Sequence, residues 1–321
     1  MFHRSSHSHQ SAELLTALNQ MKTPSQRRRL IFSLAGSMNW ICWNVRGLRN
    51  RCTVRELEVV TWAQDPAAMF LAETWSTEAR LQKLCTELKF DHCWIGPSAG
   101  KSGFLTLFWK KSVRIDVVSA SPNHIDAIVG EAVHKQWRFT GVYGFADIVR
   151  KHETWSLLCD LYRQFSLPWL CVGDFNEILW SHEKIGLSPK REALMMAFRD
   201  ILDECGFMDL GFVGDKFTLK GKRAGGLVLE CLDKAVATND LFSLNPRAKV
   251  RHLNTHSSYH KSIVIKLEGI VPRPNRPFKF KQMWLKDNGC SKSVFCLGFK
   301  HREHNHAFGC RKNKELWGKA Y

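Results

Sequence analysis

Residues 169–178 constrain the fold more than any other part of this sequence. The apolar run 169–172 has the length of a strand, stops at Gly173 and is followed by Asp174 and Asn176. In an extended strand, residues two apart point to the same face, so these two polar side chains would project together. A carboxylate there can accept a proton from water or bind a cation, and a carboxamide can orient an oxygen beside it. The alternative is an Asx turn that closes a buried strand, the commoner meaning of an isolated Gly-Asp-x-Asn pattern.

The same arrangement recurs along the chain. Six apolar runs carry a polar residue at one end: 39–43 lead to Asn44, 68–72 to Glu73, 139–142 to Tyr143, 169–172 to Asp174 and 228–232 to Asp233, and His260 precedes 262–265. Any single one of these residues is more often a cap, a turn residue or a solvated charge. Strand ends can converge on one rim of a sheet, where a buried scaffold fixes polar groups that substrate can still reach. The set of six therefore predicts a functional site.

Length and composition are compatible with such a scaffold. A chain of 321 residues with 44% hydrophobic residues can form one large domain with a sizeable core, plus tails. No apolar run approaches the roughly 18 residues that a membrane helix needs, so we expect no membrane association. The eleven cysteines are an odd number, are scattered and include no Cys-x-x-Cys pair, which argues against a disulfide framework or an ordinary zinc motif. We expect a reduced, intracellular protein, located in the nucleus.

The net charge of +17 is concentrated at the two ends of the chain. Residues 1–37 contain five Lys/Arg against one Glu, and residues 269–321 contain twelve against three Asp/Glu. Basic ends add a salt-sensitive, sequence-independent attraction to the phosphate backbone of nucleic acid. Solvated, disordered ends without a partner are the alternative that charge alone leaves open.

The patterns of charge and of apolar residues divide the chain into three parts. Residues 1–37 lack a continuous apolar period and are predicted to be a flexible basic leader. Residues 38–268 are predicted to be a mixed α/β domain, because strand-like runs alternate there with helical segments at 51–64, 76–88, 151–165 and 191–205. Residues 269–321 begin with three closely spaced prolines and are predicted to be an extended linker and a basic tail.

Several strings of residues resemble one known family in order and in content. They are Trp43-Asn44-Val45-Arg46-Gly47-Leu48, Leu71-Ala72-Glu73-Thr74, Ser121-Pro122-Asn123-His124-Ile125-Asp126, Thr140-Gly141-Val142-Tyr143-Gly144, Gly173-Asp174-Phe175-Asn176-Glu177-Ile178-Leu179 and Leu232-Asp233-Lys234-Ala235-Val236-Ala237. Over roughly residues 38–285 the chain resembles the endonuclease domain of plant LINE-type (non-LTR) retrotransposons. That domain belongs to the exonuclease-endonuclease-phosphatase superfamily, which includes the apurinic/apyrimidinic endonucleases.

The resemblance implies a fold and a set of roles. The fold would be an α/β, four-layer α/β/β/α sandwich with two mixed β-sheets, in which the strand-end residues meet in one cleft. Glu73 would bind the divalent metal, Mg²⁺ or Mn²⁺ in its place, with Asn44 and Asp174 beside it, since oxygen ligands suit such a hard cation. The other implied roles are alignment or deprotonation of water by Asp174, orientation of water and phosphate by Asn176, donation to a phosphate oxygen by Tyr143, and contact with the scissile phosphate by His260, with Asp233 as a further active-site aspartate.

The implied activity is Mg²⁺-dependent phosphodiester hydrolysis of DNA by a monomeric nicking endonuclease that needs no small-molecule cofactor. Two alternatives remain from other classes. The chain could be a catalytically inactive relic that binds nucleic acid, or a phosphatase or phospholipase of the same superfamily. No polymerase motif of a LINE-type protein follows the nuclease-like region.

One departure from the family bears on activity. The family ends its nuclease domain with Ser-Asp-His, whereas this chain has Tyr259 before His260. If that aspartate oriented and balanced the histidine, a tyrosine would leave His260 without an anionic partner and impair catalysis, because a phenol is neutral at pH 7. The alternative is that Tyr259 turns into solvent and a neighbouring carboxylate takes over. Residues 219–221 also depart from the family pattern and are expected to weaken substrate contacts.

Overall fold

The computed structural model describes residues 38–97, 103–130, 136–223 and 225–268. The predicted leader at 1–37 and the predicted linker and tail at 269–321 lie outside the described residues. Along the described part of the chain, every helix is too short or too polar to cross a membrane.

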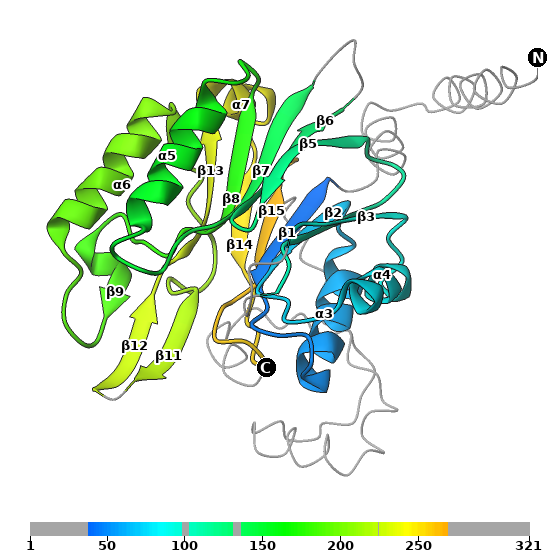
Figure 1. The fold of residues 1–321 in the computed structure, drawn as a ribbon, viewed down its shortest axis with the longest axis horizontal. Coiled ribbons are helices and arrows are strands. Elements are labelled where there is room, and N and C mark those ends of the chain that lie inside the picture. Colours follow the sequence, from blue (N-terminus) through cyan, green and yellow to red (C-terminus); the bar gives the residue numbers. More distant parts are fainter. Residues whose placement is uncertain (1–37, 98–102, 131–135, 224, 269–321) are drawn as a thin grey trace, which may run out of the picture. The chain divides into compact units, whose positions relative to one another are not determined.

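The described residues form strands and helices in close alternation (Figure 1). The strands are β1 (Asn39–Asn44), β2 (Ala68–Ala72), β3 (His92–Ile95), β4 (Thr106–Trp109), β5 (Ile115–Ser121), β6 (His124–Val129), β7 (Trp137–Tyr143), β8 (Trp169–Asp174), β9 (Lys184–Ile185), β10 (Phe207–Asp209), β11 (Leu219–Arg223), β12 (Gly226–Glu230), β13 (Asp233–Thr238), β14 (Lys249–His252) and β15 (Ile263–Lys266). The helices are α3 (Arg51–Gln64), α4 (Glu78–Glu87), α5 (Lys151–Tyr162), α6 (Glu192–Glu204) and α7 (Asn239–Leu244), with the 3-10 turn η2 (Ser181–Glu183). The four helices predicted from the sequence are all present.

Two mixed six-stranded sheets pack face to face. The first has the order β14-β15-β1-β2-β4-β3 and the second the order β10-β13-β8-β7-β6-β5. The sheets pack on both faces because their strands carry apolar side chains on both faces. In β1, Trp40 and Cys42 enter the core between the sheets, whereas Ile41 and Trp43 enter the core on the outer face. Trp40 meets Phe139 of the second sheet with ring centroids 4.5 Å apart.

Helices cover the outer face of each sheet and complete four layers (Figure 1). Leu57 of α3 and Leu81 and Leu84 of α4 pack on the first sheet. On the second sheet, Trp155 of α5 stacks on Phe198 of α6 at 4.8 Å. The predicted α/β/β/α sandwich with two mixed sheets is confirmed.

Strand direction brings distant residues to one rim. The parallel pairs β1/β2 and β7/β8 lie inside their sheets, and their carboxyl ends carry the polar residues. Since β15 runs antiparallel to β1, and β13 antiparallel to β8, these two strands begin where their neighbours end. Gly173 allows β7 and β8 to pair closely there, because a Cβ at this position would lie 1.9 Å from the Val142 carbonyl oxygen.

One sequence interpretation was wrong in detail. The run 228–232 does not form a single strand that ends at Asp233. Strand β12 ends at Glu230 and belongs to a small sheet with the order β11-β12-β9, and Asp233 is the first residue of β13. Asp233 therefore reaches the rim from the start of a strand, directly opposite Asp174 in the register of β13 and β8.

Candidate active site

The rim brings the buried Asn44 and Glu73 together with the half-buried Tyr143. Asn44 is the last residue of β1, Glu73 comes directly after β2, and Tyr143 ends β7. Glu73 Oε1 accepts hydrogen bonds from Asn44 Nδ2 at 2.7 Å and from the Tyr143 hydroxyl at 3.0 Å. Burial and the negative charges of Glu73 and Asp174 raise the pKa of Tyr143, so its phenol remains a donor.

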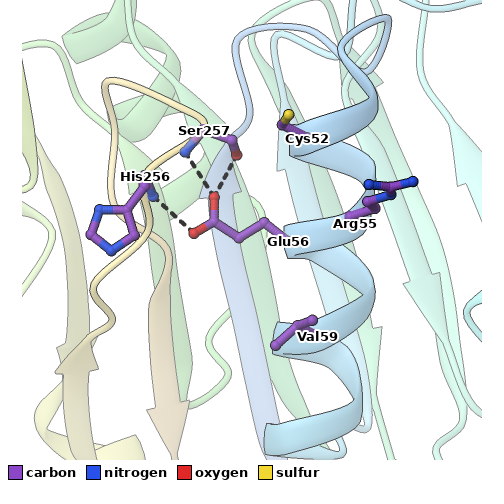
Figure 2. A pocket seen from close by; sticks show the side chains of 6 residues that line it. All are labelled: Cys52, Arg55, Glu56, Val59, His256 and Ser257. Atoms are coloured by element: carbon purple, nitrogen blue, oxygen red, sulfur yellow. Dashed lines mark hydrogen bonds between the residues drawn. The ribbon is translucent and has the colours of Figure 1, made fainter. Parts of the chain in front are cut away.

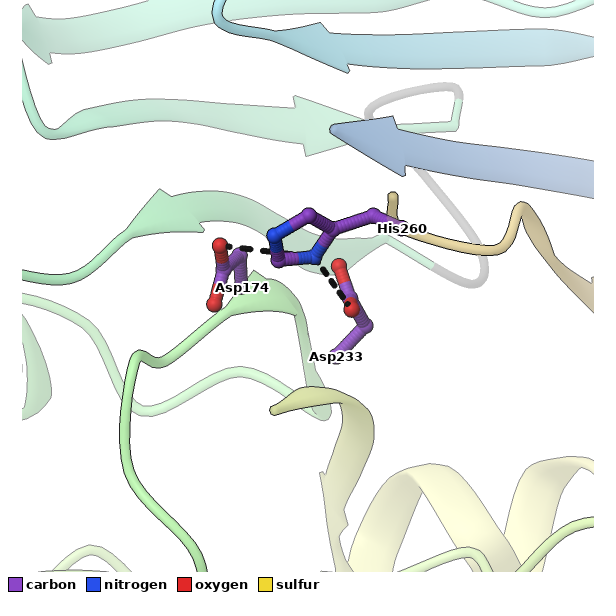
Figure 3. Close-up of side chains that lie close together, drawn as sticks. All are labelled: Asp174, Asp233 and His260. Atoms are coloured by element: carbon purple, nitrogen blue, oxygen red, sulfur yellow. Dashed lines mark hydrogen bonds and ion pairs between the residues drawn. The ribbon is translucent and has the colours of Figure 1, made fainter. Parts of the chain in front are cut away.

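A second group adjoins the first and contains Asp174, Asp233 and His260 (Figure 3). All three side chains are at most 3% exposed. His260 Nδ1 lies 2.9 Å from Asp233 Oδ2 and 3.7 Å from Asp174 Oδ2. Asn44 joins the two groups, because its Nδ2 also donates to Asp174 Oδ2 at 3.0 Å. Five of the residues predicted from strand ends thus form one continuous network with His260.

Asn176 reaches the site by a different route from the one its spacing predicts. Strand β8 ends at Asp174, and Asn176 has a left-handed backbone with φ of 54°. Its backbone N–H donates to Asp174 Oδ1 at 2.9 Å, which is the Asx turn considered as the alternative, and its Nδ2 donates to the Gly144 carbonyl at 2.8 Å. Strand alternation therefore does not align Asn176 with Asp174; a turn places it next to that carboxylate.

The expectation that Tyr259 leaves His260 without an anionic partner was wrong. Asp233, which is 27 residues earlier in the chain, contacts His260 Nδ1. Tyr259 is 61% exposed, whereas His260 is buried. A neighbouring carboxylate thus balances the charge of His260, which is the alternative to an impaired histidine that the sequence left open. Residues 219–221 lie beside this segment, where the Lys220 N–H donates to the Tyr259 carbonyl at 2.9 Å.

The backbone around the site is strained. Arg46, Glu73, Trp75 and Asn176 all adopt left-handed conformations, with φ between 44° and 54°. Such conformations cost free energy in residues other than glycine and cluster at functional sites, where the surrounding structure enforces them. Here two neighbouring loops enforce them, because the Gly47 N–H donates to the Glu73 carbonyl and the Leu48 N–H to the Thr74 carbonyl, both at 2.8 Å.

Buried charge sets the protonation of the second group. Burial alone lowers the pKa of His260, but the negative charges of Asp233 and Asp174 outweigh it and raise this pKa to about 9. Burial raises the pKa of Asp174, and the positive charge of His260 and the hydrogen bond from Asn44 offset only part of this effect. At neutral pH, His260 is therefore a cation held by carboxylates.

This ion pair should make stability depend on pH. Unfolded histidine loses its proton near pH 6.5, whereas His260 in the folded protein keeps it up to about pH 9. The stabilisation, up to about 3 kcal/mol, is thus complete below pH 6.5 and lost as the pH rises through 9. Urea unfolding in EDTA should show the free-energy gap between wild type and His260→Gln narrowing over this range. A gap that stays constant from pH 6 to pH 9.5 would contradict the assignment.

The donor set fits a hard divalent cation. Glu73, Asp174 and Asp233 supply buried carboxylate oxygens, which are the ligands that Mg²⁺ and Mn²⁺ prefer. Asp233 Oδ1 is buried and finds no hydrogen-bond partner among the described residues. A carboxylate oxygen of Asp174, one of Asp233 and a ring nitrogen of His260 lie within 4.8 Å of one another. Because a protonated imidazole cannot bind a cation, the two carboxylates are the ligands that this cluster offers. The Asn44 carboxamide presents its nitrogen to the carboxylates, while its oxygen accepts from the Arg46 N–H at 3.3 Å.

Sequence reasoning missed several residues that hold the site in place. Arg46 Nε lies 3.8 Å from Glu73 Oε2. Behind Asn176, the buried Lys151 donates to the Asn176 carbonyl at 2.6 Å and pairs with Glu177 at 3.0 Å. Arg46 and Glu177 do stand within strings quoted for the family resemblance, but Lys151 looks like any surface residue of an amphipathic helix. Only its burial shows that it supports the loop.

Helix α3 anchors the loop that leads to His260 (Figure 2). Glu56 accepts hydrogen bonds from the backbone N–H groups of His256 and Ser257, both at 2.8 Å, and from the Ser257 hydroxyl. These contacts border a pocket of about 360 Å³ that Val59 also lines. From Ser258 the hydroxyl donates to the Asn44 carbonyl at 2.9 Å. The loop is thereby fixed both to α3 and to the end of β1.

Comparison with known proteins identifies the family. Residues 41–255 match the Endonuclease/Exonuclease/phosphatase family. The chain belongs to this family. Every predicted site residue except His260 lies inside the matched region. No sequence among proteins of curated function matches the chain.

Solved structures of low sequence identity share the Endonuclease/Exonuclease/phosphatase fold. The endonuclease domain of TRAS1, a telomere-specific non-LTR retrotransposon, is 14% identical with a TM-score of 0.55, over 71% of this chain and 97% of that one. The AP endonuclease LMAP from Leishmania major is 16% identical with a TM-score of 0.57, over 79% and 98%. The 3′ phosphatase NExo from Neisseria, bound to product DNA hairpin, is 14% identical with a TM-score of 0.54, over 71% and 98%.

Proposed function

We propose that this chain is a divalent-cation-dependent DNA endonuclease of retrotransposon type that hydrolyses a phosphodiester bond. The observation that carries the proposal is the buried network at the rim, in which Glu73 and Asp174 share Asn44 while Asp233 balances His260. Carboxylates, a cationic imidazole and a phenol donor gathered at one rim of strand ends suit attack by water on a phosphate. The retrotransposon-like strings and the basic ends support DNA as the substrate. The proposal places the protein in the nucleus, where it would act as a monomer.

Each residue has a role in the proposed reaction. Glu73, with Asp174 and Asn44 next to it, would hold Mg²⁺ or Mn²⁺, which when bound supplies Lewis-acid stabilisation of negative charge on phosphoryl oxygens. Asp174, whose pKa is raised by burial, would accept the proton of the attacking water. Asn176 would orient that water. Because His260 Nδ1 is hydrogen-bonded to Asp233, the other ring nitrogen of the cationic imidazole would donate to a phosphoryl oxygen.

Supercoiled plasmid DNA provides the direct test. We expect the protein to convert supercoiled plasmid to the nicked form when Mg²⁺ is present. With EDTA in place of Mg²⁺, we expect no detectable nicking. A synthetic 3′-phosphate oligonucleotide and a phospholipid should release no phosphate or headgroup on the same timescale. Release of phosphate without nicking would establish the phosphatase alternative. DNA binding without any cleavage at saturating Mg²⁺ or Mn²⁺ would establish the inactive relic.

A further inference from the structure

Tyr259 is an exposed aromatic residue on a fixed backbone at the edge of the active site. Its carbonyl accepts from the Lys220 N–H at 2.9 Å, and the preceding Ser258 hydroxyl both donates to the Asn44 carbonyl at 2.9 Å and accepts from the His260 N–H at 3.1 Å. Glu56 holds the two residues before Ser258. The backbone of Tyr259 is therefore restrained on both sides, while 61% of the residue faces solvent.

The fold itself makes little use of the tyrosine side chain. Among the described residues, none hydrogen-bonds to its hydroxyl, and the ring is excluded from the buried clusters. A cation lies near the ring: the Arg46 guanidinium carbon is 5.7 Å from the centroid of the Tyr259 ring and 6.0 Å from that of Trp75. Arg46 is in turn held near Glu73. A positive charge and an exposed ring thus lie together beside the carboxylates.

This combination suits one class of ligand. A nucleobase can stack on an exposed aromatic ring, and each such contact is sequence-tolerant because every base has a π-face. A guanidinium near the ring adds attraction for the phosphate that follows the base. A restrained backbone lowers the conformational entropy that binding would cost. Tyr259 adjoins His260, so a base stacked there would belong to a nucleotide close to the reacting phosphate.

We propose that Tyr259, with Arg46 beside it, is a stacking site for an unstacked nucleobase of the DNA strand next to the phosphate to be cleaved. The proposal rests on the proposed function for its substrate class. It makes Tyr259 a specificity-determining residue, because it favours DNA in which a base is free to leave the duplex stack over fully paired duplex.

Equilibrium binding tests the proposal without requiring cleavage. The probes are a short fluorescent single-stranded deoxyoligonucleotide and the same oligomer built from abasic residues. Each is titrated in EDTA with the protein of residues 1–321. The salt concentration should be high enough to suppress non-specific attraction to the basic ends. We expect Tyr259→Ala to weaken binding of the base-bearing oligomer by about 5- to 150-fold, the scale of one stacking contact, and to leave binding of the abasic oligomer unchanged. Tyr259→Phe should stay within about twofold of wild type.

The matched control is Tyr162→Ala, which removes a 45% exposed tyrosine at the end of α5 and should bind both probes as wild type does. Equal affinities of wild type and Tyr259→Ala for the base-bearing oligomer would overturn the proposal. So would a loss in Tyr259→Phe as large as that in Tyr259→Ala, because it would assign the effect to the hydroxyl. The nicking assay is separate: stacking without nicking would refute only the endonuclease, and nicking without a Tyr259 effect would refute only the stacking site.

Discussion

Replacing Glu73 by glutamine should abolish metal-dependent nicking while the protein stays folded. Glutamine keeps the shape of the side chain and one acceptor oxygen for Asn44 and Tyr143, but it removes the charge that would attract the cation. Loss of one preorganised electrostatic group lowers turnover by at least about 10²-fold. The measurement is the single-turnover nicking rate at several Mg²⁺ concentrations, with thermal unfolding in EDTA to confirm the fold.

A matched control separates this effect from a change in net charge. Glu78→Gln removes an exposed carboxylate in the first turn of α4, where the side chain accepts a hydrogen bond from Gln82 of its own helix. This variant should nick DNA as wild type does. Titration with Mn²⁺ should show weaker binding by Glu73→Gln than by the control. Unchanged nicking and unchanged Mn²⁺ affinity in Glu73→Gln would rule out Glu73 as a metal ligand.

Replacing Asp233 by asparagine should lower the nicking rate about as strongly as neutralising the aspartate in an unrelated hydrolase triad, on the order of 10⁴-fold. Asparagine can still hydrogen-bond to His260 Nδ1, but it removes the Asp233 charge, which raises the pKa of His260 more than the charges of Asp174 and Glu73 do. The imidazole should then lose its proton at lower pH. The alkaline limb of the pH–rate profile of any residual activity should move down from about pH 9.

Asp215→Asn is the control for Asp233→Asn, because Asp215 is an exposed carboxylate paired with Lys261 outside the network. It should leave both rate and pH profile unchanged. The comparison also decides between the two explanations of the Tyr259 departure. If an aspartate at position 259 were the required partner of His260, the wild-type chain would already be impaired and Asp233→Asn would change little.

Much of the fold could be predicted from sequence because burial imposes local periodicity. Short, continuous apolar runs, such as β1 and the runs before Glu73 and Asp174, predict strands that are buried on both faces. In β1, alternate residues do enter two different cores. Helical periodicity located α3, α4, α5 and α6. The run 228–232 misled because all its residues except Glu230 are apolar, and periodicity cannot show that the chain turns at Cys231 and Leu232 between two strands of different sheets.

The sequence by itself determined which residues stand at strand ends: Asn44, Glu73, Tyr143 and Asp174 follow directly from where apolar runs stop. Only the tertiary structure decided which of them act on one another. The pairing of Asp233 with His260 depends on β13 running antiparallel to β8 while β15 runs antiparallel to β1, and no local pattern encodes strand order. The side-chain period specifies the face that a residue occupies, whereas its neighbour is chosen by packing across the whole sandwich. For that reason the charge balance at His260 could not be deduced from the residue beside it in the chain.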